Sequence, residues 1–340
     1  MKTPGREIIL EIGLCCALAF AGIARAVVLP TAQQFVVPSD MPKASTPQID
    51  RRALVGRHNI TLKAPDPLTP LTVGNGEFAF TADITGLQTF SQYHRRGMAL
   101  GTQAQWGWHT MPNPNEYRLA DVLEEYMVAG RAVPYASGQD KSRTYSPAAS
   151  WLRANPHRLH LGQVGLRISK TDNSSASIDD LTDTVQTLDL WTGLLTSQFK
   201  VDGQGVTVLT VCHPSRDVMV VRVESPLLRK ERLLVTLTFP HGSQDWGSAA
   251  DWSHPDRHIT RHRVASNRAD LTRILDNDRY YVSAVWSSPG VFRVASEHNY
   301  EIGSGNGTDL EIVFAFSPKQ SAEPMPDFET VRAEAGRHWG

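Results

Sequence analysis

One short stretch of the sequence combines the residue types that bind sugars. Trp106 and Trp108 are separated by one residue, and His109 and Asn113 follow them in a Pro-Asn-Pro-Asn run that turns the chain into a loop. In an extended segment two such tryptophans point to the same side. Their flat faces suit the apolar face of a sugar ring, and imidazole and amide groups can bind its hydroxyls. The stretch therefore predicts a carbohydrate-binding loop, with a packed cluster of loop side chains as the alternative.

Three histidines spaced four residues apart, His254, His258 and His262, raise the question of a metal. Pro255 and the two β-branched residues that follow disfavour the helix that would align all three. In a strand His258 and His262 would still share a face, but zinc needs a third ligand and an orienting partner. The spacing shows neither, so we predict no metal and no other cofactor.

The sequence offers no pair of carboxylates for sugar hydrolysis, which requires two such groups about 5 Å or 6.5–9.5 Å apart. Glu124-Glu125 and Asp179-Asp180 are adjacent and are typical of solvated faces. Asp245 and Asp251 each precede a tryptophan, for which loop packing is the simpler explanation. The turn at residues 74–76 is Gly-Asn-Gly, without the lysine and helix of a phosphate loop. We therefore assign no catalytic residue.

The composition excludes several classes of protein. The 340 residues carry 34 basic and 35 acidic side chains, so there is no excess positive charge for nucleic acid or an anionic membrane. The chain is 41% hydrophobic and can bury a sizeable core. Its length allows two ordinary domains or one large β domain.

The N-terminus has the pattern of a secretory signal peptide, residues 1–26. Lys2 and Arg6 precede an apolar run over residues 12–23, which ends in Ala-Arg-Ala. A membrane anchor is the alternative, but the run is shorter than the roughly 20 residues that span a bilayer. We therefore expect a secreted, extracellular protein. Residues 27–52 are rich in Pro, Ser and Thr and predict a linker or arm.

The cysteine content and the Asn-x-Ser/Thr sequons are the two features that bear on a secreted chain. Beyond the signal peptide Cys212 is the only cysteine, which excludes an internal disulfide and favours a buried structural thiol. Asn59, Asn173 and Asn306 lie in Asn-x-Ser/Thr sequons and are candidate glycosylation sites.

Alternating apolar residues predict strands through most of the remaining chain. The clearest runs are residues 77–84, 165–168, 205–211, 218–223, 233–239, 280–286 and 310–316. Between them we predict one short helix, over residues 119–128. The pattern predicts an all-β fold, a large antiparallel sandwich of two sheets over residues 53–322.

Helical periodicity returns at the end of the chain, over residues 323–340. Phe328, Val331, Ala335 and Trp339 recur at helical spacing, and Asp327 has the character of an N-cap. A helix that stops at a large apolar residue leaves apolar surface in water. We therefore expect the chain to continue in the complete gene product, or to dock on a partner.

Two groups of segments resemble a known family. They are LTVGNGEF at residues 71–78, and LDLWTGLLTSQF at 188–199 followed by residues 208–211 and HPSRD at 213–217. They are similar to the N-terminal β domain of six-hairpin glycosidases, which include trehalose and maltose hydrolases and phosphorylases of glycoside hydrolase family sixty-five. The resemblance spans residues 54–339. It implies a supersandwich similar to galactose mutarotase, joined by a linker helix to an (α/α)6 barrel that carries the catalytic carboxylates.

The resemblance implies a non-catalytic β domain of a secreted glycosidase that acts on oligosaccharides, with carbohydrate and the (α/α)6 domain as its partners. The barrel and its carboxylates have no counterpart here, so whether the chain is itself an enzyme stays open. Two alternatives remain. One is a stand-alone carbohydrate-binding module. The other is an aldose epimerase with a histidine acid and a glutamate base, drawn from His109, His241 and Glu297.

Overall fold

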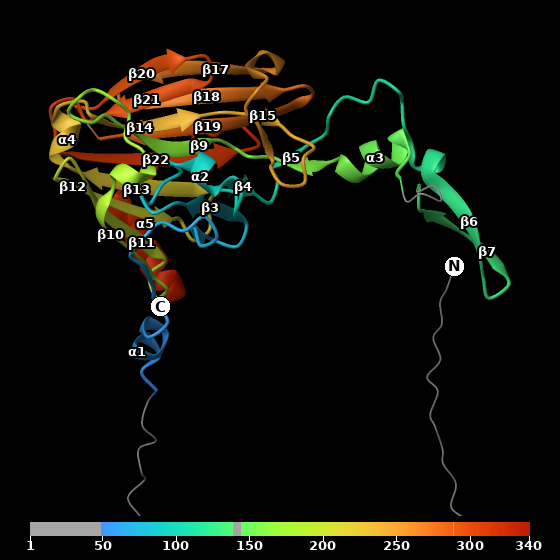
Figure 1. Ribbon diagram of the computed structural model, residues 1–340, viewed down its shortest axis with the longest axis horizontal. Helices are drawn as coiled ribbons and strands as arrows, with labels where there is room; N and C mark the ends of the chain where they lie inside the picture. The colour runs from blue at the N-terminus through green and yellow to red at the C-terminus, as the bar shows by residue number, and fades with distance from the viewer. Residues whose placement is uncertain (1–48, 139–143, 288) are drawn as a thin grey trace, which may run out of the picture. The chain divides into compact units, whose positions relative to one another are not determined.

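Antiparallel strands are the main regular structure of the described residues, as Figure 1 shows. The computed structural model describes residues 49–138, 144–287 and 289–340. The predicted signal peptide and nearly all of the predicted linker lie outside these residues. The helix α1 (Arg51–Gly56) crosses the predicted boundary at residue 53, because Asp50 caps it by accepting a hydrogen bond from the amide of Ala53 at 2.9 Å.

The larger sheet has nine strands, and every neighbouring pair is antiparallel. In sheet order they are β1 (Ile60–Leu62), β10 (Thr182–Asp189), β11 (Leu194–Val201), β12 (Gln204–Cys212), β13 (Val218–Glu224), β22 (Asp309–Ser317), β19 (Asp278–Trp286), β18 (Arg268–Leu275) and β17 (His258–Ala265). The first five strands follow chain order, β22 comes next to β13, and β19, β18 and β17 then follow in reverse chain order.

A second sheet of four strands faces the first across one apolar core. Its order is β20 (Val291–Ser296), β21 (Asn299–Gly303), β14 (Leu233–Thr238) and β9 (Gln163–Ile168). Phe199 and Phe314 of the larger sheet share this core with Leu237 and Tyr300 of the smaller one. The predicted all-β fold of two antiparallel sheets is therefore confirmed, and each predicted strand is present.

Shorter elements complete the described chain. One small sheet has three strands, β2 (Leu71–Gly74), β3 (Phe78–Ala82) and β4 (Thr102–Ala104), and three further pairs are β5 (Trp108–His109) with β8 (His157–Arg158), β6 (Leu123–Val128) with β7 (Arg131–Ala136), and β15 (His241–Gly242) with β16 (Ala250–Asp251). The short α-helices are α2 (Ser91–His94), α3 (Pro147–Ala154) and α4 (Pro226–Arg229). The 3-10 helices are η1 (Leu119–Val122), η2 (Ile178–Asp180) and η3 (Pro255–Arg257). None of the described helices combines the length and the apolar character needed to span a bilayer.

The helix predicted over residues 119–128 is wrong. The segment forms η1 and then β6, which pairs with β7 along its whole length. Ala129 and Gly130 both have positive φ, the backbone of a tight hairpin turn. The turn and the cross-strand bonds outweigh the local helical spacing of the apolar residues.

The C-terminal helix is confirmed as α5 (Phe328–Trp339), red in Figure 1. Asp327 caps it, as predicted, by accepting a hydrogen bond from the amide of Thr330 at 2.7 Å. Phe328, Val331 and Ala335 are buried on the outer face of the larger sheet. Their partners are the valines Val211, Val218, Val220 and Val313. The amphipathic pattern is thus explained by packing within this chain, while Trp339 stays half-exposed.

A loop between β3 and α2, residues 83–90, is buried where the two sheets approach each other. Buried loops are rare because their polar backbone groups need partners. Here the partners come from both sheets. The amide of Gln88 donates to the carbonyl of Val164 at 2.7 Å, Thr210 Oγ1 donates to the carbonyl of Gly86 at 2.9 Å, and Gln186 Nε2 donates to the carbonyl of Asp83 at 2.7 Å.

The predicted structural role of Cys212 is confirmed. Its thiol is free and buried at the end of β12, and this burial raises its pKa. A thiol in that state is a poor nucleophile.

Candidate functional site

The two groups of segments that carry the family resemblance contact each other. Asn75 Nδ2 donates hydrogen bonds to the carbonyls of His213, at 3.2 Å, and Arg216, at 3.0 Å. The Gly-Asn-Gly turn is therefore a clamp on the loop between β12 and β13. At the end of that loop Asp217 Oδ2 accepts a hydrogen bond from Trp106 Nε1 at 2.6 Å. The clamp thus positions the predicted carbohydrate-binding loop.

Trp106 and Trp108 do not form a common aromatic face. The amide of Gly107 donates to the carbonyl of Ala104 at 2.9 Å, which makes a turn where extended chain was expected. Trp106 is drawn inward by Asp217 and packs against the core and the ring of Tyr280. Only Trp108, with 43% of its surface exposed, faces solvent.

The indole of Trp108 is held in place on β5. Its Nε1 donates to the carbonyl of Gln105 at 3.0 Å, and the guanidinium of Arg158 lies 4.1 Å from the ring centroid. Arg158 is the residue opposite Trp108 in the β5–β8 pair, and its Nη1 donates to the carbonyl of Ala104 at 3.0 Å. The exposed ring is therefore fixed from one side by a cation–π contact.

Asn113 lies apart from this contact. Its Oδ1 accepts from the amide of Tyr117 at 3.0 Å and its Nδ2 donates to the carbonyl of Tyr117 at 2.9 Å. The side chain closes the turn over residues 113–117, and its amide is occupied within the loop.

His109 points the opposite way from Trp108, into a polar cluster of two buried histidines and two aspartates that solvent reaches. Its Nδ1 lies 2.7 Å from Asp278 Oδ2, and its Nε2 lies 3.2 Å from Asp276 Oδ2. His241 Nε2 lies 3.3 Å from the same oxygen of Asp276. Both histidines are 2% exposed. Among the described residues, His109, His241 and Asp276 are side chains that could hold one metal ion.

The three histidines that are spaced four residues apart in the sequence do not form this cluster. His254 lies 2.7 Å from Asp251, and His262 is exposed on β17. His258 is buried beside Arg273, whose Nη2 donates to its Nδ1 at 2.7 Å. Burial, with the charge of Arg273, lowers the pKa of His258 to about 3.

A row of four imidazole rings begins at His109. Ring centroids are 5.4 Å apart between His109 and His241, 5.9 Å between His241 and His258, and 3.9 Å between His258 and His298. Glu297 lies at the far end, with its carboxylate 3.5 Å from His298. The structure thus brings His109 and His241 together, and it places Glu297 beside a different histidine.

Trp252 is a second exposed aromatic near these short strands. It follows Asp251, which is paired with His241 in the β15–β16 ladder. Its ring makes an edge contact with the buried imidazole of His160, at a centroid distance of 5.8 Å. His160 in turn comes just after β8, the partner of β5.

His160 should make stability depend on pH. Burial lowers its pKa from 6.5 to about 4, and its Nδ1 accepts a hydrogen bond from the amide of Gly162 at 3.2 Å, which requires the neutral ring. Because the pKa of His160 is lower in the folded state than in the unfolded state, its contribution to stability is complete above pH 6.5 and is lost as the pH falls toward 4.

The variant His160→Asn keeps a hydrogen-bond acceptor but does not titrate. Between pH 7 and pH 4.5 the free energy of unfolding should fall about 2.5 kcal/mol less in this variant than in the parent, measured by urea denaturation. Equal falls would contradict the assignment.

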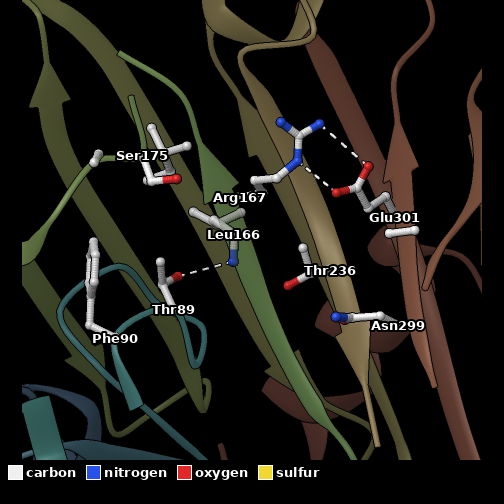
Figure 2. Close-up of a pocket in the computed structure, with 11 residues that line it drawn as sticks. Thr89, Phe90, Leu166, Arg167, Ser175, Thr236, Asn299 and Glu301 are labelled. Carbon is white, nitrogen blue, oxygen red and sulfur yellow. Dashed lines mark hydrogen bonds and ion pairs between the residues drawn. The ribbon is translucent and has the colours of Figure 1, made fainter. Parts of the chain in front are cut away.

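A separate hollow of about 280 Å³ lies over β9, β14 and β21 (Figure 2). Arg167 and Glu301 form an ion pair in its lining, with Nε and Oε1 2.6 Å apart, and Thr236 and Asn299 also line it. The two charged groups satisfy each other, which leaves neither free to bind a charged ligand. The hollow therefore has fewer groups free to bind a ligand than the cluster at His109.

The three sequons differ in their surroundings. Asn173 and Asn306 are exposed in turns. Asn59 is partly buried, and its Oδ1 accepts a hydrogen bond from the amide of Leu190 at 2.9 Å. Glycosylation at each remains a prediction.

No protein-family model matches the chain, and no curated protein is a significant match. Among solved structures, the chain is similar to a putative kojibiose phosphorylase from the human microbiome. The identity is 12%, the match covers 83% of this chain and 37% of the phosphorylase, and the TM-score is 0.45. It is also similar to an inverting mannosidase of family GH92 from Bacteroides thetaiotaomicron, with 14% identity, 52% and 25% coverage, and a TM-score of 0.31. The chain thus spans little more than a third of the phosphorylase and a quarter of the mannosidase.

Proposed function

We propose that this chain is the β domain of a secreted glycoside-processing protein, and that it binds carbohydrate on the surface around Trp108. The observation that carries the proposal is the fixed, half-exposed ring of Trp108, with Arg158 against it. A ring held in this way loses little side-chain entropy when a sugar stacks on it. Stacking on a flat aromatic face is a common mode of sugar recognition.

A carboxylate close to β5 offers a hydrogen-bond acceptor to sugar hydroxyls. Asp278 is 40% exposed, and one of its oxygens is held by His109. The amide of Thr110 lies 3.3 Å from the same oxygen, so the carboxylate is fixed near the strand that carries Trp108. An oriented acceptor close to the strand that carries an aromatic ring can add to sugar recognition.

Trp108→Ala should weaken binding of a gluco-oligosaccharide at least tenfold, about 1.4 kcal/mol, because the stacking surface is lost. The measurement is calorimetric titration of the secreted chain with maltose and kojibiose series. Trp246→Ala is the matched control, since Trp246 is 74% exposed and its ring lies over Arg153 of α3 rather than over Arg158. Equal affinity of the parent and Trp108→Ala would refute this site.

We further propose that catalysis is supplied by an (α/α)6 domain outside this chain. At the site, the carboxylates of Asp276 and Asp278 both contact the buried ring of His109. Neither is placed as a free acid and base across a sugar. The purified chain should therefore bind oligosaccharides without cleaving them, and release of glucose would contradict this role.

A stand-alone carbohydrate-binding module would use the same surface around Trp108. The epimerase alternative is less favoured because Glu297 lies away from His109 and His241.

A further inference from the structure

Three side chains from separate elements meet at one point behind Trp108. His109 comes from β5, His241 from β15, and Asp276 from the turn between β18 and β19. We propose that these three side chains bind a zinc ion, and that the ion joins the three elements. The proposal is independent of carbohydrate binding.

The distances match the coordination of zinc. Zinc bonds to imidazole nitrogen and carboxylate oxygen are roughly 2.0–2.2 Å long, so a tetrahedral ion holds its ligand atoms about 3.4 Å apart. The two Nε2 atoms lie 3.2 and 3.3 Å from Asp276 Oδ2. All three atoms lie within 4.8 Å of one another. Only small adjustments would bring them around one ion.

The imidazole nitrogens are otherwise unsatisfied. His109 Nε2 and both ring nitrogens of His241 are buried and have no hydrogen-bond partner among the described residues. Although each Nε2 is close to Asp276, neither has the direction of a hydrogen bond to it. Buried polar atoms without partners are unfavourable by about 1–3 kcal/mol each. A metal ion would satisfy both Nε2 atoms at once.

The surroundings orient the ligands as in known zinc sites. Asp278 Oδ2 lies 2.7 Å from His109 Nδ1, so this carboxylate can accept the ring proton and direct Nε2 toward the ion. Gly242 allows the backbone to approach the ring, because a β-carbon there would lie 2.3 Å from His109 Cδ2. His109 is therefore held from two sides.

The donor set selects the metal. Two neutral imidazoles and one carboxylate favour zinc and related transition metals, whereas calcium and magnesium prefer oxygen ligands. Three protein ligands leave a fourth position for water. The side chain of Asp276 is 23% exposed, which gives the site a side that solvent can reach.

The first test is zinc binding by the full chain without a histidine tag, after dialysis against a chelator. We expect one equivalent of Zn²⁺ by calorimetry and by elemental analysis, and no measurable Ca²⁺ binding. Asp276→Asn and His241→Asn should each weaken Zn²⁺ binding at least roughly 100-fold, and Asp278→Asn roughly 10–100-fold. His262→Asn, which removes an exposed histidine on β17, should leave binding unchanged.

The second test separates loss of the site from loss of the fold. Asp276 has φ of 49°, a conformation that asparagine adopts readily, so Asp276→Asn should fold like the parent. Zn²⁺ should raise the melting temperature of the parent and of His262→Asn, and leave that of Asp276→Asn unchanged. The proposal is overturned if the parent binds no Zn²⁺, or if Asp276→Asn and His241→Asn bind it as the parent does.

Discussion

Replacing Arg273 with alanine is expected to lower the free energy of unfolding by about 4 kcal/mol. Arg273 lies on β18 with none of its surface exposed. Among the described residues, no carboxylate lies within ion-pair distance of its guanidinium. The charge of the guanidinium is instead stabilised by hydrogen bonds to neutral acceptors, an arrangement that is rare for a buried charge.

The acceptors around Arg273 come from two separate segments, Pro240 and the strand β17. Its Nη2 donates to the carbonyl of Pro240 at 2.8 Å and to His258 Nδ1 at 2.7 Å, and its Nη1 donates to Thr260 Oγ1. Phe239 covers the guanidinium, with the ring centroid 4.8 Å away. Alanine would leave these acceptors without a donor and would open a cavity beside Phe239.

Two variants make this measurement specific. Arg273→Met fills most of the volume and removes only the donors, so its loss should be about half as large. Arg268→Ala removes an arginine from the same strand that bonds the partly exposed Asp270, and should change stability by less than about 1 kcal/mol. Urea denaturation monitored by tryptophan fluorescence gives all three values. A loss for Arg273→Ala no greater than that for Arg268→Ala would show that the buried charge contributes little.

Asp83→Ala should be the second most damaging change, with a loss of about 3 kcal/mol. The carboxylate of Asp83 is buried in the loop over residues 83–90 and accepts three hydrogen bonds. They come from the amide of Thr85 at 2.8 Å, the hydroxyl of Thr85 at 2.6 Å and the amide of Phe90 at 2.6 Å. Burial raises the pKa of this carboxyl, and the three bonds oppose that rise.

The matched control is Asp66→Ala. Asp66 makes the same kind of local turn, accepting a hydrogen bond from the amide of Leu68 at 2.9 Å, but at an exposed position. Its loss should stay below about 1 kcal/mol, because water replaces the carboxylate. Similar midpoints for the two variants in a denaturation series would contradict the role assigned to Asp83.

The two-sheet sandwich could be predicted because apolar and polar residues alternate along its strands with the two-residue period of a β-strand. β14 and β19 bury every second side chain, or nearly so, and each run is bounded by turn residues. The hairpin of β6 and β7 could not be predicted in this way. Its strands are exposed on both faces, so no alternation marks them, and the turn at Ala129-Gly130 was the only available signal.

The site was predictable only in part, because its groups are far apart in sequence. His109 was identified by its place beside Trp108, but its partners Asp276 and Asp278 lie about 170 residues later. No local pattern connects them, and the charged turn Asp-Asn-Asp at residues 276–278 was the one available signal. The inward turn of Trp106 was missed for a similar reason, since Asp217 is 111 residues away.

The buried loop over residues 83–90 has a consequence for biosynthesis. Gly86 receives its hydrogen bond from Thr210, 124 residues further along the chain. Until that distant strand has left the ribosome, the loop has polar groups that only water can satisfy, and the early strands beside it stay open. The N-terminal third of the domain should therefore be the part of the nascent chain most exposed to chaperones and proteases.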